Sequence, residues 1–155
     1  GTTIPLELPY GDMWLRDRDR PALLIAGGTG ISAILSLLRS MSGDPAWSTR
    51  PVHVLYGAGT MDELVCWDEL QDLTNQMPAA NVHGALVSAD QSWEGTRGFV
   101  TETLAGLLGS DPGHGWSPAA GVVYLAGPPP MVSAVQDVLA ANGIQLDRIH
   151  VDSFG

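Results

Sequence analysis

The chain of 155 residues predicts a doubly wound α/β fold, in which helices cover both faces of a parallel sheet of five strands. Short apolar runs alternate along the chain with longer segments that place Leu, Ile, Val and Ala at spacings of three and four residues. Gly43 and Gly143 fall just past two of the longer segments, where glycine commonly ends a helix. This alternation implies parallel strands joined by crossover helices.

Five strands and four helices are expected after residue 20. The first strand, at 22–26, is an uninterrupted apolar run, which is typical of a strand buried on both faces. Further strands are expected at 52–56, 82–88, 122–126 and 148–151. Helices are expected at 31–41, 61–76, 100–108 and 131–142. Residues 109–121 are rich in Gly, Pro and Ser, which predicts a surface loop.

The composition indicates an acidic globular domain. Hydrophobic residues make up 45% of the chain, and 17 acidic residues stand against 7 basic ones, all arginine. A net charge of −10 repels nucleic acid and anionic lipid, so neither is expected as a partner. We find no apolar run of membrane-spanning length and no export signal, and we therefore expect a cytoplasmic protein. The single cysteine, Cys66, is expected to be a small buried hydrophobe.

A glycine-rich turn follows the first expected strand and precedes the first helix. Gly27, Gly28 and Gly30 let the backbone turn tightly and approach a phosphate without a Cβ in the way. A helix N-terminus at this point aims its N–H groups at an anion. The turn therefore predicts a nucleotide phosphate site, with a plain strand-to-helix turn as the alternative. It is not a P-loop because the chain has no lysine, and Ala33 stands where a third spaced glycine would be.

Four of the five expected strand exits carry small or turn-forming residues, which close approach of a ligand to the backbone requires. In parallel sheets, ligands bind at the carboxyl ends of the strands. The exits are Gly27 to Gly30, Tyr56 to Thr60, Ser88 to Asp90, Gly127 to Met131 and Asp152 to Gly155. The cofactor site is thus expected along this edge of the sheet.

These exits together resemble the NAD(P)-binding domain of the ferredoxin–NADP reductase superfamily, and most of all the reductase components of bacterial methane, phenol, toluene and benzoate oxygenase systems. The matching segments occur in the family's order and span nearly the whole chain. They are Gly27 to Ile31, Tyr56 to Ala58, Asp62 to Leu64, Gly98 to Val100 and Gly127 to Met131. The resemblance implies the strand order 3-2-1-4-5 and an NAD(H)-binding domain over residues 21–155.

The opening of the chain, Pro9 to Gly11 and Leu15 to Asp17, is similar to the end of that family's flavin-binding barrel. The resemblance implies that residues 1–20 are the last barrel strand and a linker. The chain is then expected to be part of a longer reductase. FAD would be bound mainly by a barrel outside this chain, and a [2Fe-2S] centre would lie elsewhere in the parent protein. The chain alone is expected to be inactive without the flavin domain.

Carried onto matching positions, the resemblance implies a set of site residues. Those expected to bind NAD are Gly28, Thr29, Gly30, Ile31, Tyr56, Gly57, Ala58, Ser88, Asp90, Gly127, Pro128, Pro129 and Met131. Two residues are expected at the reacting end, Thr29 close to the flavin and Phe154 over it, where the nicotinamide must stack. Tyr10 and Gly11 are expected near the flavin from the barrel side.

The third strand exit, Ser88-Ala89-Asp90, predicts NADH rather than NADPH. NADP-using relatives place an arginine here, because its guanidinium binds the 2′-phosphate through two hydrogen bonds. A carboxylate repels that phosphate and accepts hydrogen bonds from free ribose hydroxyls. Arg97 is the only cation nearby in the sequence.

The implied activity is that of an NADH-dependent flavoprotein oxidoreductase that passes electrons through the [2Fe-2S] centre to an oxygenase component. Hydride transfer between two cofactors needs no side-chain acid or base, so positioning is the protein's task. Two alternatives stay open. One is a nucleotide-binding sensor module without redox chemistry. The other is a reductase of the same superfamily that serves a haem protein or a quinone.

Other chemistry-bearing residues favour structural roles. The four histidines lack ligand spacing, so no metal site is expected. Trp67 and Trp93 are expected to pack rather than to stack on a cofactor. The acidic run Asp62, Glu63, Asp68, Glu69 and Asp72 is expected to be a solvated helix face, with contact of one member to an adenosine ribose as the alternative.

Overall fold

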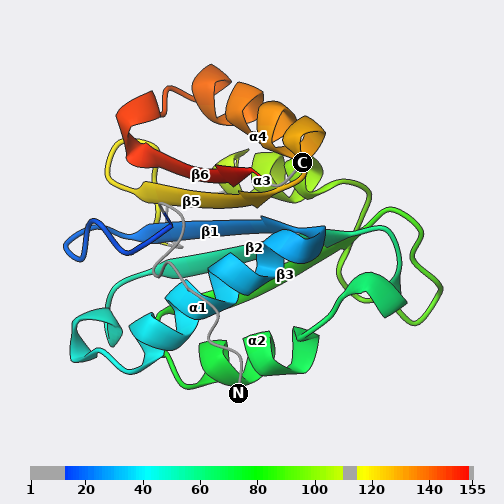
Figure 1. Cartoon of the computed structure of the whole chain (residues 1–155), viewed down its shortest axis with the longest axis horizontal. Coiled ribbons are helices and arrows are strands. Elements are labelled where there is room, and N and C mark those ends of the chain that lie inside the picture. The colour runs from blue at the N-terminus through cyan, green and yellow to red at the C-terminus, as the bar shows by residue number, and fades with distance from the viewer. Residues whose placement is uncertain (1–12, 110–114, 154–155) are drawn as a thin grey trace, which may run out of the picture.

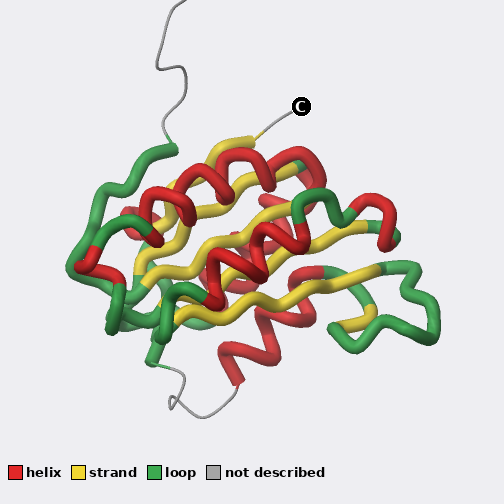
Figure 2. Tube along the Cα trace, turned by 90° about the horizontal axis from the view of Figure 1, so that it is seen from below, coloured by secondary structure: helices red, strands yellow, loops and turns green. Residues whose placement is uncertain are grey.

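The computed structural model describes residues 13–109 and 115–153 and shows a parallel sheet between two layers of helices (Figures 1 and 2). All strand pairings are parallel, in the order β4-β3-β2-β1-β5-β6. The strands are β1 (Ala22–Gly27), β2 (Val52–Ala58), β3 (Ala80–Leu86), β4 (Thr96–Arg97), β5 (Val122–Gly127) and β6 (Ile149–Ser153). The strand alternation and the helix coverage predicted from the sequence are confirmed.

Four α-helices cover the two faces of the sheet. They are α1 (Ile31–Ser42), α2 (Trp67–Asn75), α3 (Val100–Gly109) and α4 (Pro129–Ala141). One core layer joins the sheet to α1 and α2 through residues such as Ile34 and Leu70. The second layer joins it to α3 and α4 through residues such as Leu104 and Val135. No helix in the described residues is both long and apolar enough to cross a membrane.

The sheet has six strands, so the expected number of five was wrong. The five expected strands keep their predicted order as β3-β2-β1-β5-β6, and β4 is added at the edge beside β3. In β4, Thr96 pairs with Ala85 and Arg97 pairs with Leu86. Two residues are too few to show a periodic pattern, so only the tertiary pairing makes this segment a strand.

The helix expected at 61–76 is interrupted. A 3₁₀ turn, η3 (Met61–Glu63), is followed by an irregular step, and α2 begins only at Trp67. The backbone leaves helical geometry at Leu64, which has a ψ of 62°, and the hydroxyl of Tyr56 donates a hydrogen bond to the neighbouring carbonyl of Glu63 at 3.2 Å. Cys66 has a left-handed φ of 59° and is exposed, so the expected burial of this thiol was wrong.

Strand β1 lies at the centre of the sheet and is buried along its whole length. Leu24 faces the layer of α1 and α2, while Leu23 and Ile25 face the layer of α3 and α4. The predicted burial on both faces is therefore confirmed. Because β1 is packed from four sides, the turn that follows it starts from a rigid position.

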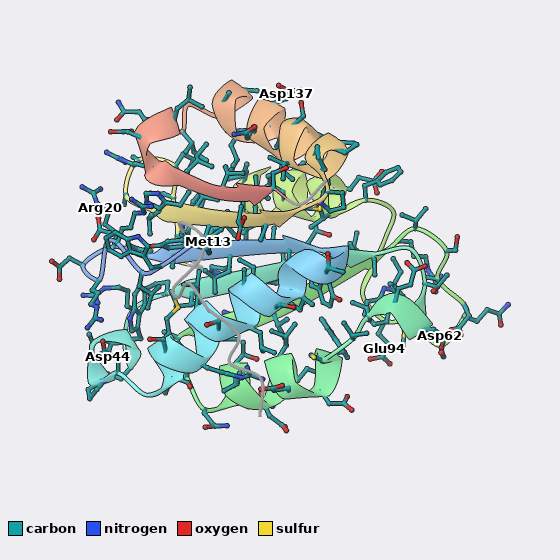
Figure 3. All side chains as sticks on the ribbon, viewed as in Figure 1. Met13, Arg20, Asp44, Asp62, Glu94 and Asp137 are labelled. Carbon is teal, nitrogen blue, oxygen red and sulfur yellow. The ribbon has the colours of Figure 1, made fainter. Side chains whose placement is uncertain are left out.

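The segment before β1 is held against the sheet. The backbone N–H of Arg16 donates to the hydroxyl of Tyr124 on β5 at 2.9 Å, and Met13 and Leu15 pack on the α1 side of the core. Arg18 pairs with Asp44 at 3.2 Å. Asp44 lies at the end of the molecule that holds the amino ends of the strands (Figure 3). Whether residues 1–20 end a flavin-binding barrel stays a prediction.

A pH dependence of stability is expected from His150. Its ring lies 5.2 Å from that of Tyr124, and burial, with a further contribution from Arg16, lowers its pKa from 6.5. The unfolded chain therefore binds a proton that the folded chain does not, and stability falls as pH drops below 6.5 toward the lowered value. Urea unfolding near pH 7.5 and near pH 5.5 is expected to show a smaller pH effect in His150→Gln than in the unaltered chain. An equal pH effect in both chains would remove His150 as a source.

Candidate functional site

A cavity of about 550 Å³ lies at the carboxyl ends of β1, β2 and β5. It is lined by the turn after β1, by the exit of β2, by the residues that lead into α3 and by the first turn of α4. The strand order reverses between β1 and β5, and this is the place where doubly wound sheets bind ligands. The cavity therefore lies on the edge that the sequence predicts for a cofactor.

Two glycines of the turn after β1 have different physical roles. Gly28 has a φ of +52°, and a Cβ added there would meet nothing within 4 Å, so its backbone is open to a ligand. Gly30 is packed instead. A Cβ at Gly30 would lie 2.7 Å from the backbone nitrogen of Gly127 and closer still to the carbonyl of Ala126. Gly30 thus lets α1 begin directly against β5.

Five residues predicted to bind NAD line the cavity. They are Gly28, Gly57, Ala58, Pro128 and Met131. Their main chains come from three strand exits, which the parallel topology brings together although they are distant in sequence. The side chain of Met131 lies over Gly27 and Gly127, where added Cβ atoms would collide with its sulfur or methyl group. These glycines make room for the methionine that forms one wall.

Other predicted residues do not line this cavity, and their contact with a cofactor stays a prediction. They are Thr29, Gly30, Ile31, Tyr56, Ser88, Asp90, Gly127 and Pro129. Tyr56 is fully buried in the layer of α1 and α2, on the other side of the sheet from the cavity wall formed by α3 and α4. Burial, with a smaller contribution from Cys66, raises the pKa of Tyr56, so the phenol stays neutral. The predicted positions Tyr10, Gly11 and Phe154 lie outside the described residues.

The structure adds Phe99, to which sequence reasoning gave no role, and it selects Glu63 from the acidic run for which contact with an adenosine ribose was the alternative. Phe99 is 64% exposed and stands at the cavity, and Glu63 brings a carboxylate to it from η3. Phe99 lies in the segment Gly98 to Val100 that carried the resemblance, so the signal was present without an assigned function. The backbone N–H of Phe99 donates to Glu102 at 3.1 Å, which fixes the start of α3.

The lining of the cavity offers few side-chain groups that could bind an anion. Among its lining residues Glu63 is the only charged one. The prolines at 128, 129 and 130 have no N–H, so the first turn of α4 offers few donors. The expectation that the turn after β1 binds a phosphate through its backbone N–H groups stays a prediction.

The segment after β3 is tied together by its own polar groups. The Asp90 carboxylate accepts from the Ser92 hydroxyl at 2.6 Å and from the Ser92 N–H at 2.9 Å, and these bonds lower the pKa of Asp90. Arg97 donates to the carbonyls of Ala89, Asp90 and Trp93 at 2.9, 2.8 and 3.1 Å. Arg97 thus braces the loop.

The tryptophans pack as predicted. The rings of Trp67 and Trp93 lie 5.6 Å apart, and Trp93 covers Gly84 while its indole N–H donates to Thr96 at 3.0 Å. They border an open groove of about 670 Å³ that is lined by α2, β3 and the loop between β3 and β4. His53 and His83 stack at 5.8 Å. Within residues 13–109 and 115–153, no group of three His, Cys, Asp or Glu side chains is placed to hold a metal ion.

Comparisons with known proteins agree with this geometry. The model of the oxidoreductase NAD-binding domain family matches residues 24–137. The chain is 32% identical to the anthranilate 1,2-dioxygenase electron transfer component of Acinetobacter baylyi, over 99% of this chain and 42% of that protein. It is 36% identical to the propane 2-monooxygenase reductase component of Mycolicibacterium smegmatis, over 99% of this chain and 43% of that protein. The chain thus spans less than half the length of these relatives.

A solved structure, the ferredoxin reductase in carbazole 1,9a-dioxygenase, superimposes with a TM-score of 0.70 at 30% identity, over 88% of this chain and 38% of that one. The family match covers most of the chain, and its bounds include the turn after β1, the exits of β2 and β3 and the first turn of α4. The chain belongs to the oxidoreductase NAD-binding domain family, and its relatives include the electron-transfer components of bacterial oxygenases.

Proposed function

We propose that this chain binds NADH in the cavity at the carboxyl ends of β1, β2 and β5, as the NADH-binding domain of a flavin-dependent reductase. The observation that carries the proposal is the cavity itself, which joins the open backbone of Gly28 to the exits of β2 and β5 at the reversal of strand order. A volume of about 550 Å³ is within the range of small-molecule and cofactor sites.

The chain's own residues bind and orient the cofactor. We place the pyrophosphate at the open backbone of Gly28, where Met131 and Pro128 shield it from water on one side. When bound, NADH would supply a hydride to an FAD held mainly by a domain outside this chain. Thr29 and Phe154 are proposed to stand near the flavin. Because proximity and orientation are the protein's contribution, no side-chain acid or base is needed.

We also propose that the parent protein passes electrons through a [2Fe-2S] centre to an oxygenase. The relatives support this proposal because they are named as electron-transfer or reductase components of dioxygenases and monooxygenases. A sensor module of the same fold would bind the dinucleotide without such a partner. Flavin reduction by NADH, measured in a chain extended to include the proposed flavin domain, distinguishes a reductase from a sensor module. A reductase reduces the flavin, and a sensor module does not.

Calorimetric titration of the chain with NADH, NADPH and ADP-ribose tests the proposed site. We expect NADH and ADP-ribose to bind, and we expect the affinity for NADPH to be about tenfold lower than that for NADH (~1.4 kcal/mol). The reason is the charge of the cavity, where a carboxylate is present and Arg97 is committed to three carbonyls. If none of the three binds, the same titration is repeated with the extended chain. Absence of binding there overturns the proposed site.

Replacing Phe99 by alanine is expected to lower the affinity of the chain for NADH and for ADP-ribose by about tenfold. The exposed ring stands at the β2–β3 end of the cavity, where it offers an apolar surface on which adenine can stack. Leu146→Ala is the matched control, because Leu146 is 71% exposed but lies before β6, away from the cavity. Equal affinities in Phe99→Ala and the unaltered chain would exclude stacking on this ring.

A further inference from the structure

The carboxylate of Glu63 is held at the cavity by contacts at both ends of the residue. Its Oε2 accepts a hydrogen bond from the N–H of Gly59 at 2.8 Å, just beyond the end of β2. Its carbonyl accepts from the buried hydroxyl of Tyr56 at 3.2 Å. A Cβ at Gly59 would lie 2.6 Å from Oε2, so the absence of a side chain at 59 gives the carboxylate its place.

This arrangement changes what the exit of β2 can bind. A free backbone N–H at a strand exit is a donor that a phosphate can use. At Gly59 that donor is already taken by Glu63. A carboxylate has about four lone-pair positions, so Glu63 can still accept hydrogen bonds from hydroxyl groups. This corner of the cavity is therefore suited to a sugar hydroxyl and repels a phosphate.

The other acidic candidate, Asp90, lies outside the cavity. Its Oδ1 accepts both the N–H and the hydroxyl of Ser92, which closes the loop after β3. Asp90 does not line the cavity, whereas Glu63 does. Asp62, the neighbour of Glu63 on η3, does not line it either and lies at the outer rim of the molecule (Figure 3).

We propose that Glu63 determines the preference for NADH over NADPH, by accepting a hydrogen bond from an adenosine ribose hydroxyl and repelling a 2′-phosphate. This inference rests on the proposed function, and it assigns to Glu63 the discrimination that the sequence predicted for Asp90. The adenosine half is expected at this corner because β2 and β3 lie on one side of the turn after β1, and the reversal toward β5 lies on the other.

The test is the ratio of the dissociation constants for NADPH and NADH, measured by calorimetry on the whole chain. Glu63→Gln keeps an oxygen that accepts from Gly59 and removes the charge. We expect it to reduce the ratio by about fivefold, the effect of roughly 1 kcal/mol between nearby charges in water. Asp62→Asn is the matched control and is expected to leave the ratio within about twofold, because it removes the same charge outside the cavity.

Asp90→Asn is the competing variant, and we expect it to change the ratio less than Glu63→Gln does. A larger change in Asp90→Asn, or equal changes in all three variants, overturns the assignment. Glu63→Asp keeps the charge but shortens the side chain by one methylene group, and we expect it to give an intermediate ratio. With this second variant, the test does not depend on the folding of Glu63→Gln alone. If the unaltered chain and its extended form bind no dinucleotide, the proposed function fails, and this assignment fails with it. NADH binding with an unchanged ratio in Glu63→Gln refutes this assignment alone.

Discussion

Gly30→Ala is expected to destabilise the chain by about 3 kcal/mol or more and to abolish NADH binding. The added Cβ would lie 2.7 Å from the nitrogen of Gly127 and closer to the carbonyl of Ala126. These atoms belong to the backbone of β5, which is paired on both sides, so they cannot move aside as a flexible side chain would. The start of α1 must then shift away from the sheet. Urea unfolding followed by circular dichroism measures the loss.

The control for Gly30→Ala is Gly106→Ala. Gly106 lies inside α3, and a Cβ there would meet nothing within 4 Å. Alanine is the better helix former, so this change is expected to stabilise the chain by about 0.5–1 kcal/mol. A Gly30→Ala chain as stable as the unaltered one would mean that α1 and β5 do not approach as closely as the structure shows.

Trp116→Ala is expected to cost about 3–5 kcal/mol of folding stability. Trp116 is 1% exposed and belongs to the core layer between the sheet and the helices α3 and α4. Its indole ring lies against Gly121, where any added Cβ would collide with it. Removal of so large a side chain leaves a cavity that the surrounding strands and helices cannot fill. The midpoint of urea unfolding is expected to fall strongly.

NADH affinity should separate this loss of stability from a loss of the site. Trp116 precedes β5, at the end of the sheet opposite to the cavity, so the folded fraction of Trp116→Ala is expected to bind NADH as the unaltered chain does. Trp14→Ala is the control for the size of the change, because Trp14 is 55% exposed and its loss should cost well under about 1 kcal/mol. Equal unfolding midpoints for Trp116→Ala and Trp14→Ala would contradict the burial of Trp116.

Elements with a strong local signal were predictable from the sequence. The apolar run of β1 and the spacing of Leu and Ile along α1 reflect burial that depends on few partners. Strand β4 has no such signal, because its two residues become a strand only by pairing with Ala85 and Leu86. The break before α2 also has no local signal, and in the folded chain it lies at Leu64, beside the hydrogen bond from Tyr56 to the Glu63 carbonyl.

Some features of the candidate site were also predictable from the sequence, and others were not. The glycine turn and the small residues at the strand exits are visible in the linear pattern, and they predict the edge where a cofactor is expected. The strand order was implied by the resemblance to the family, and the sheet confirms it for the five expected strands. Tertiary contacts place Phe99 and Glu63 at the cavity and tie Asp90 and Arg97 into their own loop, and neither arrangement is visible in the linear pattern. The physical reason is that a side chain's partners depend on three-dimensional contacts. At Gly59 and Glu63, a missing Cβ and a hydrogen bond of 2.8 Å place a carboxylate that residue type alone could not locate.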